Sequence, residues 1–158
     1  MNKEIPYIIS SLQRTLDGEP WYGRAVITML EEIDPSMAHK KPGKNAHTLA
    51  DLLWHMITWA EFTLRRLEGD KEKDDNFFEK IDWRPIDPAT HTWQEGIKQF
   101  EEKNRQIILI LQDKDDSLLK EIVDFREYNF RFLLNGYIQH NIYHIGQIAY
   151  LKKLLEGE

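Results

Sequence analysis

The C-terminal part of the chain carries an unbroken helical pattern, and this pattern constrains the fold more than any other feature. From about Glu127 to Leu155, apolar side chains recur three and four residues apart, as on one face of an α-helix about 45 Å long. One stripe of this helix contains Leu133, Tyr137, His140, His144, Ile148, Leu151 and Leu155. Such a stripe needs other helices to cover it. Gly136 and Gly146 interrupt the pattern, and we expect them either to allow close approach of another backbone or to have no packing role.

Similar patterns, separated by breaks that contain proline or glycine, predict the partner helices. We expect these helices over residues 3–16, 21–34, 48–68 and 93–112. The break at residues 17–20 leaves two possibilities for the first pair, either one kinked helix or two collinear helices. Residues typical of helix caps mark several of the other ends: Thr48 with Asp51, Thr92 with Glu95, and Gly69.

The remaining segments are connections, and together with the helices they define the expected fold class. Residues 70–91 are polar and contain two prolines, so we expect an irregular surface segment that either covers a functional region or joins distant helix ends. Residues 118–126 are expected to be extended. No other segment has a strand pattern. The sequence therefore predicts an all-α fold, a four-helix bundle, with residues 1–158 forming a single domain.

The composition excludes several classes of function. The chain has no cysteine, so disulfides, thiolate metal sites and a cysteine nucleophile are ruled out, and a cytoplasmic location is expected. The net charge of −6 argues against nucleic acid and against anionic membrane surfaces as partners. The sequence contains neither an apolar run long enough to span a membrane nor the pattern of a secretory signal.

Three of the six histidines lie on predicted buried stripes. His140 and His144 are four residues apart, so both rings point into the same small volume. His55 lies on a second stripe, with Leu52, Trp59 and Phe62. Burial of neutral imidazole costs free energy unless its nitrogens find partners. A divalent metal held by three imidazoles explains the set. Packing, with the histidines hydrogen-bonded to one another and to water, is the alternative. The loop histidines are expected at the surface: His39, His47 and His91.

The spacing of these histidines differs from known metal motifs that carry their own catalytic carboxylate. A zincin has Glu directly after its first histidine, whereas Asn141 follows His140 here. The Glu-x-x-His pairs of di-iron bundles are also missing. Three histidine ligands leave at least one position on the metal for water or substrate, as in catalytic sites. The catalytic group is accordingly expected to be water or a thiol at this position.

Three polar residues on the same helices are candidates to support the ligands or the reaction: Asp51, Gln147 and Tyr137. Asp51 lies one turn before His55 and would accept its free N–H, although a role in the helix cap competes with this. Gln147 lies three residues after His144. Tyr137 would donate a proton near the metal, or else serve only in packing.

Two segments resemble the DinB/YfiT-like family of small bacterial four-helix-bundle proteins: LADLLWHMITWAEFTLRRLEG and FRFLLNGYIQHNIYHIGQIAYLKK. The early DGEPWYG also looks like a stretch that many members carry, and the resemblance spans about residues 5–155. It implies a divalent metal, usually nickel or zinc, held by His55, His140 and His144, and often a homodimer. Characterised relatives include thiol-S-transferases that use bacillithiol or mycothiol and a mycothiol-dependent isomerase. Many others are only called metal-dependent hydrolases.

The residues and the resemblance together favour a metal-dependent enzyme. The metal would activate water or a low-molecular-weight thiol for hydrolysis of, or thiol-S-transfer to, a small-molecule substrate. Because the chain has no cysteine, the thiol would come from a cofactor. The alternative is a non-catalytic helical bundle that binds a metal or a small ligand. A cavity beside the histidines would favour the enzyme, and a site sealed by Leu and Trp side chains would favour the alternative.

Overall fold

The computed structural model describes residues 3–157, and this part of the chain is all-α and has no named strand. Its α-helices and 3₁₀-helices (η) follow one another in this order: α1 (Glu4–Leu16), α2 (Val26–Glu31), η1 (Pro35–Met37), α3 (Leu49–Glu68), α4 (Asp75–Ile81), α5 (Trp93–Gln112), η2 (Leu118–Lys120) and α6 (Phe130–Glu156). The predicted all-α class is confirmed. None of the helices in the described part combines the length and the hydropathy of a membrane span.

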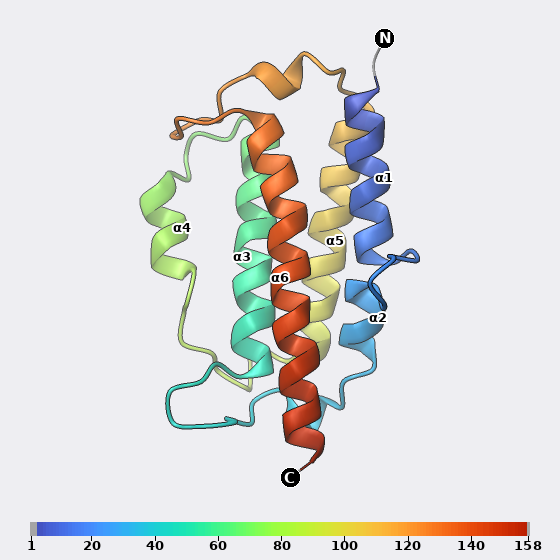
Figure 1. The fold of residues 1–158 in the computed structure, drawn as a ribbon. Helices are drawn as coiled ribbons and strands as arrows, with labels where there is room; N and C mark the ends of the chain where they lie inside the picture. The colour runs from blue at the N-terminus through green and yellow to red at the C-terminus, as the bar shows by residue number, and fades with distance from the viewer. Residues whose placement is uncertain (1–2, 158) are drawn as a thin grey trace.

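The four longer helices lie side by side, and α4 lies on the outer side of α3 (Figure 1). Helix α3 packs against α5 and α6, and α1 packs against the same two helices. The contact between α3 and α5 is close at Gly96, where a Cβ atom would lie only 2.7 Å from Cδ2 of Leu53. Gly136 and Gly146 have no such role, because a Cβ atom at either position would meet nothing within 4 Å. Of the two alternatives for these glycines, close approach of another backbone is therefore wrong, and the lack of a packing role agrees with the structure.

The caps show why the helices begin and end where they do. Thr48 and Asp51 form the predicted capping box at the start of α3, and Gly69 ends this helix in the left-handed conformation with φ 71°. At the start of α5, the hydroxyl of Thr92 accepts a hydrogen bond from the backbone N–H of Glu95. The Glu95 carboxylate accepts from the side chain of Gln99 and not from the backbone N–H of Thr92. Only the Thr92 half of the second predicted capping box is therefore formed.

Two expected helix starts differ from the structure. Helix α2 begins at Val26, and the residues before it turn back with Trp21 fully exposed, so α1 and α2 are separate helices. Helix α6 begins at Phe130, three residues later than predicted, because Asn129 caps it and also pairs with Ile122 in an isolated antiparallel bridge. The expected extended segment over 118–126 begins instead with η2.

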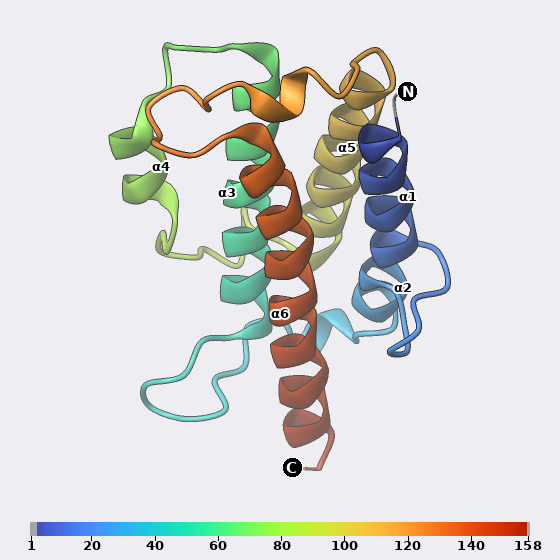
Figure 2. The same ribbon diagram turned by 45° about the horizontal axis from the view of Figure 1, so that its top comes forward.

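The connection between α3 and α5 is more ordered than the sequence indicates, because it contains α4. The carboxylate of Asp74 caps this helix, and Phe78 is fully buried with its ring 5.2 Å from that of Phe62 on α3. Figure 2 shows α4 beside α3 from a second direction. The buried ring anchors α4 and so fixes the position of the residues that follow it.

A half-buried carboxylate contributes to the packing of α3 against α5. Glu61 on α3 accepts from Nζ of Lys103 on α5 at 2.5 Å and from Nε of Arg65 at 2.7 Å, with Lys73 at 3.4 Å. Burial alone would raise the pKa of Glu61, but the hydrogen bonds from Lys103 and Arg65 outweigh burial and lower the pKa to about 2.

We predict that Glu61→Gln lowers the free energy of unfolding at pH 7 by about 1–3 kcal/mol, because the half-buried Lys103 and Arg65 lose their charged partner. The folded pKa lies below the ordinary value of 4.5, so the stabilisation is present above that pH and disappears as the pH falls toward 2. Urea unfolding at several pH values measures it. Glu102→Gln, which breaks an exposed pair with Arg105, is the control and should change little. Equal effects of the two substitutions would contradict the prediction.

Candidate metal centre

The three predicted ligands come together between α3 and α6. His55 projects from α3, and His140 and His144 project toward it from successive turns of α6. The Nε2 atom of His55 lies 3.0 Å from Nε2 of His140 and 3.0 Å from Nε2 of His144. His55 and His144 are buried, whereas His140 is half-buried. The structure therefore presents three imidazole nitrogens to one small volume, which could hold a metal ion.

Partners at the far side of two rings fix which nitrogen carries the proton. Nδ1 of His55 lies 2.5 Å from Oδ1 of Asp82, and because a carboxylate only accepts, this nitrogen donates its N–H. Nδ1 of His144 lies 2.6 Å from Oε1 of Gln147, whose amide nitrogen is in turn directed to the hydroxyl of Tyr143. In the neutral rings, Nε2 of both His55 and His144 therefore carries a lone pair that faces the cluster.

This arrangement of donors fits a divalent cation. Two lone pairs 3.0 Å apart, on His55 and His144, repel each other unless something positive lies between them. If Nε2 of His140 carried a proton, it could donate a hydrogen bond to the lone pair of His55. The lone pair of His144 would still have no donor. Nitrogen ligands about 2.0–2.1 Å from one metal ion lie about 2.9–3.4 Å from one another, which matches the spacing observed here. The residues present thus suit a metal better than they suit a network of hydrogen bonds among themselves.

Burial also keeps His140 and His144 uncharged. Burial, followed by the neighbouring His144 and His55, lowers the pKa of His140 to about 3. The pKa of His144 is lowered for the same first reason, although its hydrogen bond with Gln147 acts in the opposite direction. At neutral pH both rings are therefore in the deprotonated form that binds metal ions.

Two residues of the site, Asp82 and Trp83, were not singled out by the sequence analysis. They directly follow α4. Asp82 accepts both from His55 and from the indole N–H of Trp59, at 3.0 Å. The ring of Trp83 stacks on His55 with a centroid distance of 3.9 Å, and the exposed ring of His47 stacks on it in turn at 4.0 Å. The only signal in the sequence was the length of the 70–91 connection, which does cover the site.

The structure places two of the predicted supporting residues elsewhere. The carboxylate of Asp51 accepts the backbone N–H of the helix cap, so its predicted contact with His55 is wrong and Asp82 makes that contact instead. The hydroxyl of Tyr137 donates to Oδ1 of Asn104 at 2.6 Å, and burial raises the pKa of this tyrosine. Its proton is thus donated to Asn104 in the core and not to an imidazole. Gln147 lies against His144, where helix geometry put it.

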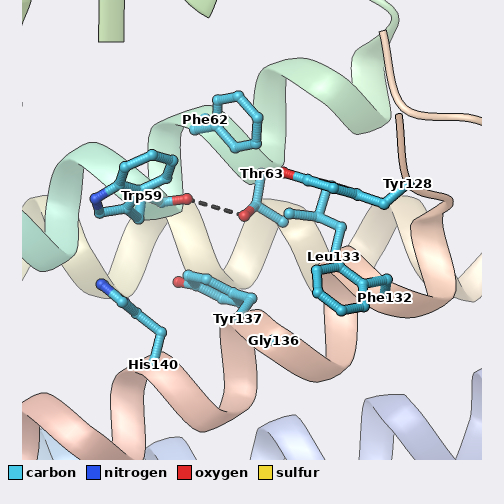
Figure 3. A pocket seen from close by; sticks show the side chains of 9 residues that line it. All are labelled: Trp59, Phe62, Thr63, Tyr128, Phe132, Leu133, Gly136, Tyr137 and His140. Carbon is cyan, nitrogen blue, oxygen red and sulfur yellow. Dashed lines mark hydrogen bonds between the residues drawn. The ribbon is translucent and has the colours of Figure 1, made fainter. Parts of the chain in front are cut away.

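A cavity of about 250 Å³ opens beside the histidines, between α3 and α6. Nine residues line it: Trp59, Phe62, Thr63, Tyr128, Phe132, Leu133, Gly136, Tyr137 and His140. Figure 3 shows Trp59 and His140 at one end of the cavity and Phe132 and Tyr128 at the other. A wider hollow between α1, α2 and α5 is lined by none of the three histidines. The site is therefore not sealed, since one of its imidazoles forms part of a cavity wall.

We predict that Asp82→Ala weakens zinc binding about 10–100-fold, because the orientation and proton of His55 depend on this carboxylate. The measurement is a competition titration of the metal-free protein against a chromophoric zinc chelator. Asp51→Ala is the matched control, since it removes a carboxylate one turn from His55 that does not contact the ring. It should lower helix stability and leave zinc affinity unchanged. A larger loss of affinity in the Asp51 variant would contradict the geometry.

Comparison with known proteins agrees with this architecture. No curated protein and no solved structure matches the chain. A family model, the DinB superfamily, matches residues 23–148, which is well over half of the sequence and includes all three histidines. The chain therefore belongs to the DinB superfamily.

Proposed function

We propose that the protein is a divalent-metal-dependent enzyme that acts on a small molecule, built as a four-helix bundle of the DinB/YfiT-like type. His55, His140 and His144 would hold the ion, with zinc or nickel as the candidates. The observation that carries the proposal is the convergence of the three Nε2 atoms while Asp82 and Gln147 occupy the far nitrogens of two rings. Such fixed, inward lone pairs are what a metal requires and what a packed core avoids.

The bound cation would supply a Lewis acid that lowers the pKa of water or of a low-molecular-weight thiol and so makes a nucleophile near neutral pH. Residues of the chain orient the ligands and exclude water from the site. Asp82 holds the His55 ring and the Trp59 indole in one arrangement. Trp83 covers the open face of His55 and excludes water there. Because the chain has no cysteine, a thiol reaction needs a separate thiol cofactor, whereas hydrolysis needs only water.

The cavity beside His140 favours the enzyme over a purely structural metal site. A structural site is closed by protein ligands, whereas a catalytic site keeps a position open to substrate. The three histidines supply too few ligands to close the site, and the Asp82 carboxylate is engaged with His55 and Trp59. We therefore propose a small-molecule substrate. A homodimer and a cytoplasmic location remain proposals that follow from the family resemblance and the lack of cysteine.

The first test is the metal content of untagged protein, measured by mass spectrometry. We expect about one equivalent of zinc or nickel per chain in the wild type and a loss of it in His140→Ala/His144→Ala, which removes two of three ligands. His39→Ala is the control because this histidine lies in a loop outside the cluster, and it should retain the metal. No metal in the wild type, even after incubation with zinc and nickel above the imidazole pKa, would contradict the proposal.

The second test is turnover. The metal-loaded protein should hydrolyse a nitrophenyl ester, or replace the chlorine of chlorodinitrobenzene by a low-molecular-weight thiol with release of chloride, faster than the same protein treated with a chelator. His144→Ala should abolish this difference, because it removes a buried ligand without touching the cavity wall. Unchanged turnover in this variant would show that the observed reaction does not use the histidine site.

A further inference from the structure

The cavity beside His140 is almost wholly apolar, although it adjoins a polar site. Six of its lining residues are aromatic or aliphatic: Trp59, Phe62, Tyr128, Phe132, Leu133 and Tyr137. No Asp, Glu, Lys or Arg side chain lines it. The hydroxyl of Thr63 donates to the backbone carbonyl of Trp59, and that of Tyr137 donates to Asn104, so neither hydroxyl proton is offered to an occupant (Figure 3). An ionised group in this cavity would lose its hydration without gaining a partner of opposite charge from the side chains that line it.

A glycine borders the cavity and adds to its open volume. Gly136 lies on the α6 side of the cavity, and a Cβ atom there would meet nothing within 4 Å. This residue neither allows close helix packing nor adopts a left-handed conformation, yet a glycine inside a helix costs about 1 kcal/mol relative to alanine. What the glycine provides is the open volume itself. The cavity of about 250 Å³ exceeds the roughly 150 Å³ of an engineered apolar cavity that holds benzene.

The position of the cavity relative to the histidines orients an occupant. His140 and Trp59 form one end, with ring centroids 6.3 Å apart, and Nε2 of His140 belongs to the imidazole cluster. An apolar group held between the aromatic walls would direct its attached polar group toward that end (Figure 3).

We propose that this cavity binds the uncharged, apolar part of the substrate, about one aromatic ring in size, and that Gly136 determines how large that part can be. This inference rests on the proposed function, because it assigns the substrate class of the same site. The reacting group of the substrate lies at the His140 end, and the apolar ring lies between Phe62, Leu133 and the aromatic residues beyond them.

The test is the binding of fluorobenzene, followed by ¹⁹F NMR, to zinc-loaded and to chelator-treated protein. Wild-type protein should bind the probe saturably in both forms, because only one of the nine lining residues, His140, is also a proposed metal ligand. Gly136→Leu should weaken binding about tenfold or more, since the new side chain occupies the cavity. Gly136→Ala should give a smaller loss, and it serves as the second variant if the leucine variant does not fold.

Gly146→Leu is the matched control. This glycine lies on the same helix, is exposed, has free space around a Cβ atom and does not line the cavity. Its variant should bind fluorobenzene like the wild type. Equal binding by the Gly136 and Gly146 variants, or no saturable binding by the wild type, would overturn the proposal.

Zinc content measured on the same samples separates this inference from the proposed function. Zinc without fluorobenzene binding would leave the metal site standing and reject the apolar subsite. Fluorobenzene binding that Gly136→Leu removes, in a protein that takes up no zinc, would support the cavity as a binding site and reject the metal-dependent reaction.

Discussion

Three imidazoles that lie together between α3 and α6, two of them buried, are the strongest constraint on this molecule, because the nitrogens of a buried ring need partners once water is removed. The far nitrogens of His55 and His144 are satisfied by Asp82 and Gln147. Those two hydrogen bonds fix the protons and leave the near nitrogens as lone pairs at 3.0 Å. Leucine at these positions would pack in the core without the free-energy cost of burying imidazole nitrogens. A cation at the centre would relieve the repulsion between these lone pairs.

The partner of the His55 imidazole comes from the connection between α3 and α5. Asp82 can reach His55 only because α4 ends beside α3, and α4 is held there by the burial of Phe78 against Phe62. The same carboxylate oxygen accepts from Trp59, which forms a wall of the cavity. The packing of α4, the orientation of one metal ligand and the shape of the cavity therefore depend on one another. A change in any of them is expected to be felt in the other two.

The sequence predicted those features that depend on residues close together in the chain. The period of three and four residues placed His140 and His144 on one buried stripe, the Thr48–Asp51 spacing marked the start of α3, and helix geometry put Gln147 against His144. It failed where the partner lies far along the chain. Asp51 was the only carboxylate one turn from His55, yet Asp82 makes the contact, because α4 brings back a residue 27 positions away. The cavity at Gly136 could likewise not be predicted from the sequence, since only the packed structure shows that a Cβ atom at this glycine would meet no neighbouring atom.

The contrast between the polar cluster and the apolar cavity suggests separate roles for them in the proposed reaction, namely chemistry at the cluster and substrate binding in the cavity. Contacts between an apolar ring and aromatic walls are nearly the same before and during a reaction, so they contribute binding rather than acceleration. In the proposed reaction, charge would develop at the reacting group, and the imidazole end is where the chain could respond to it. The apolar walls strengthen that response, because they exclude water and lower the local dielectric around the ligands. A cavity without charged side chains thus serves a metal-dependent reaction better than a polar one of the same size would.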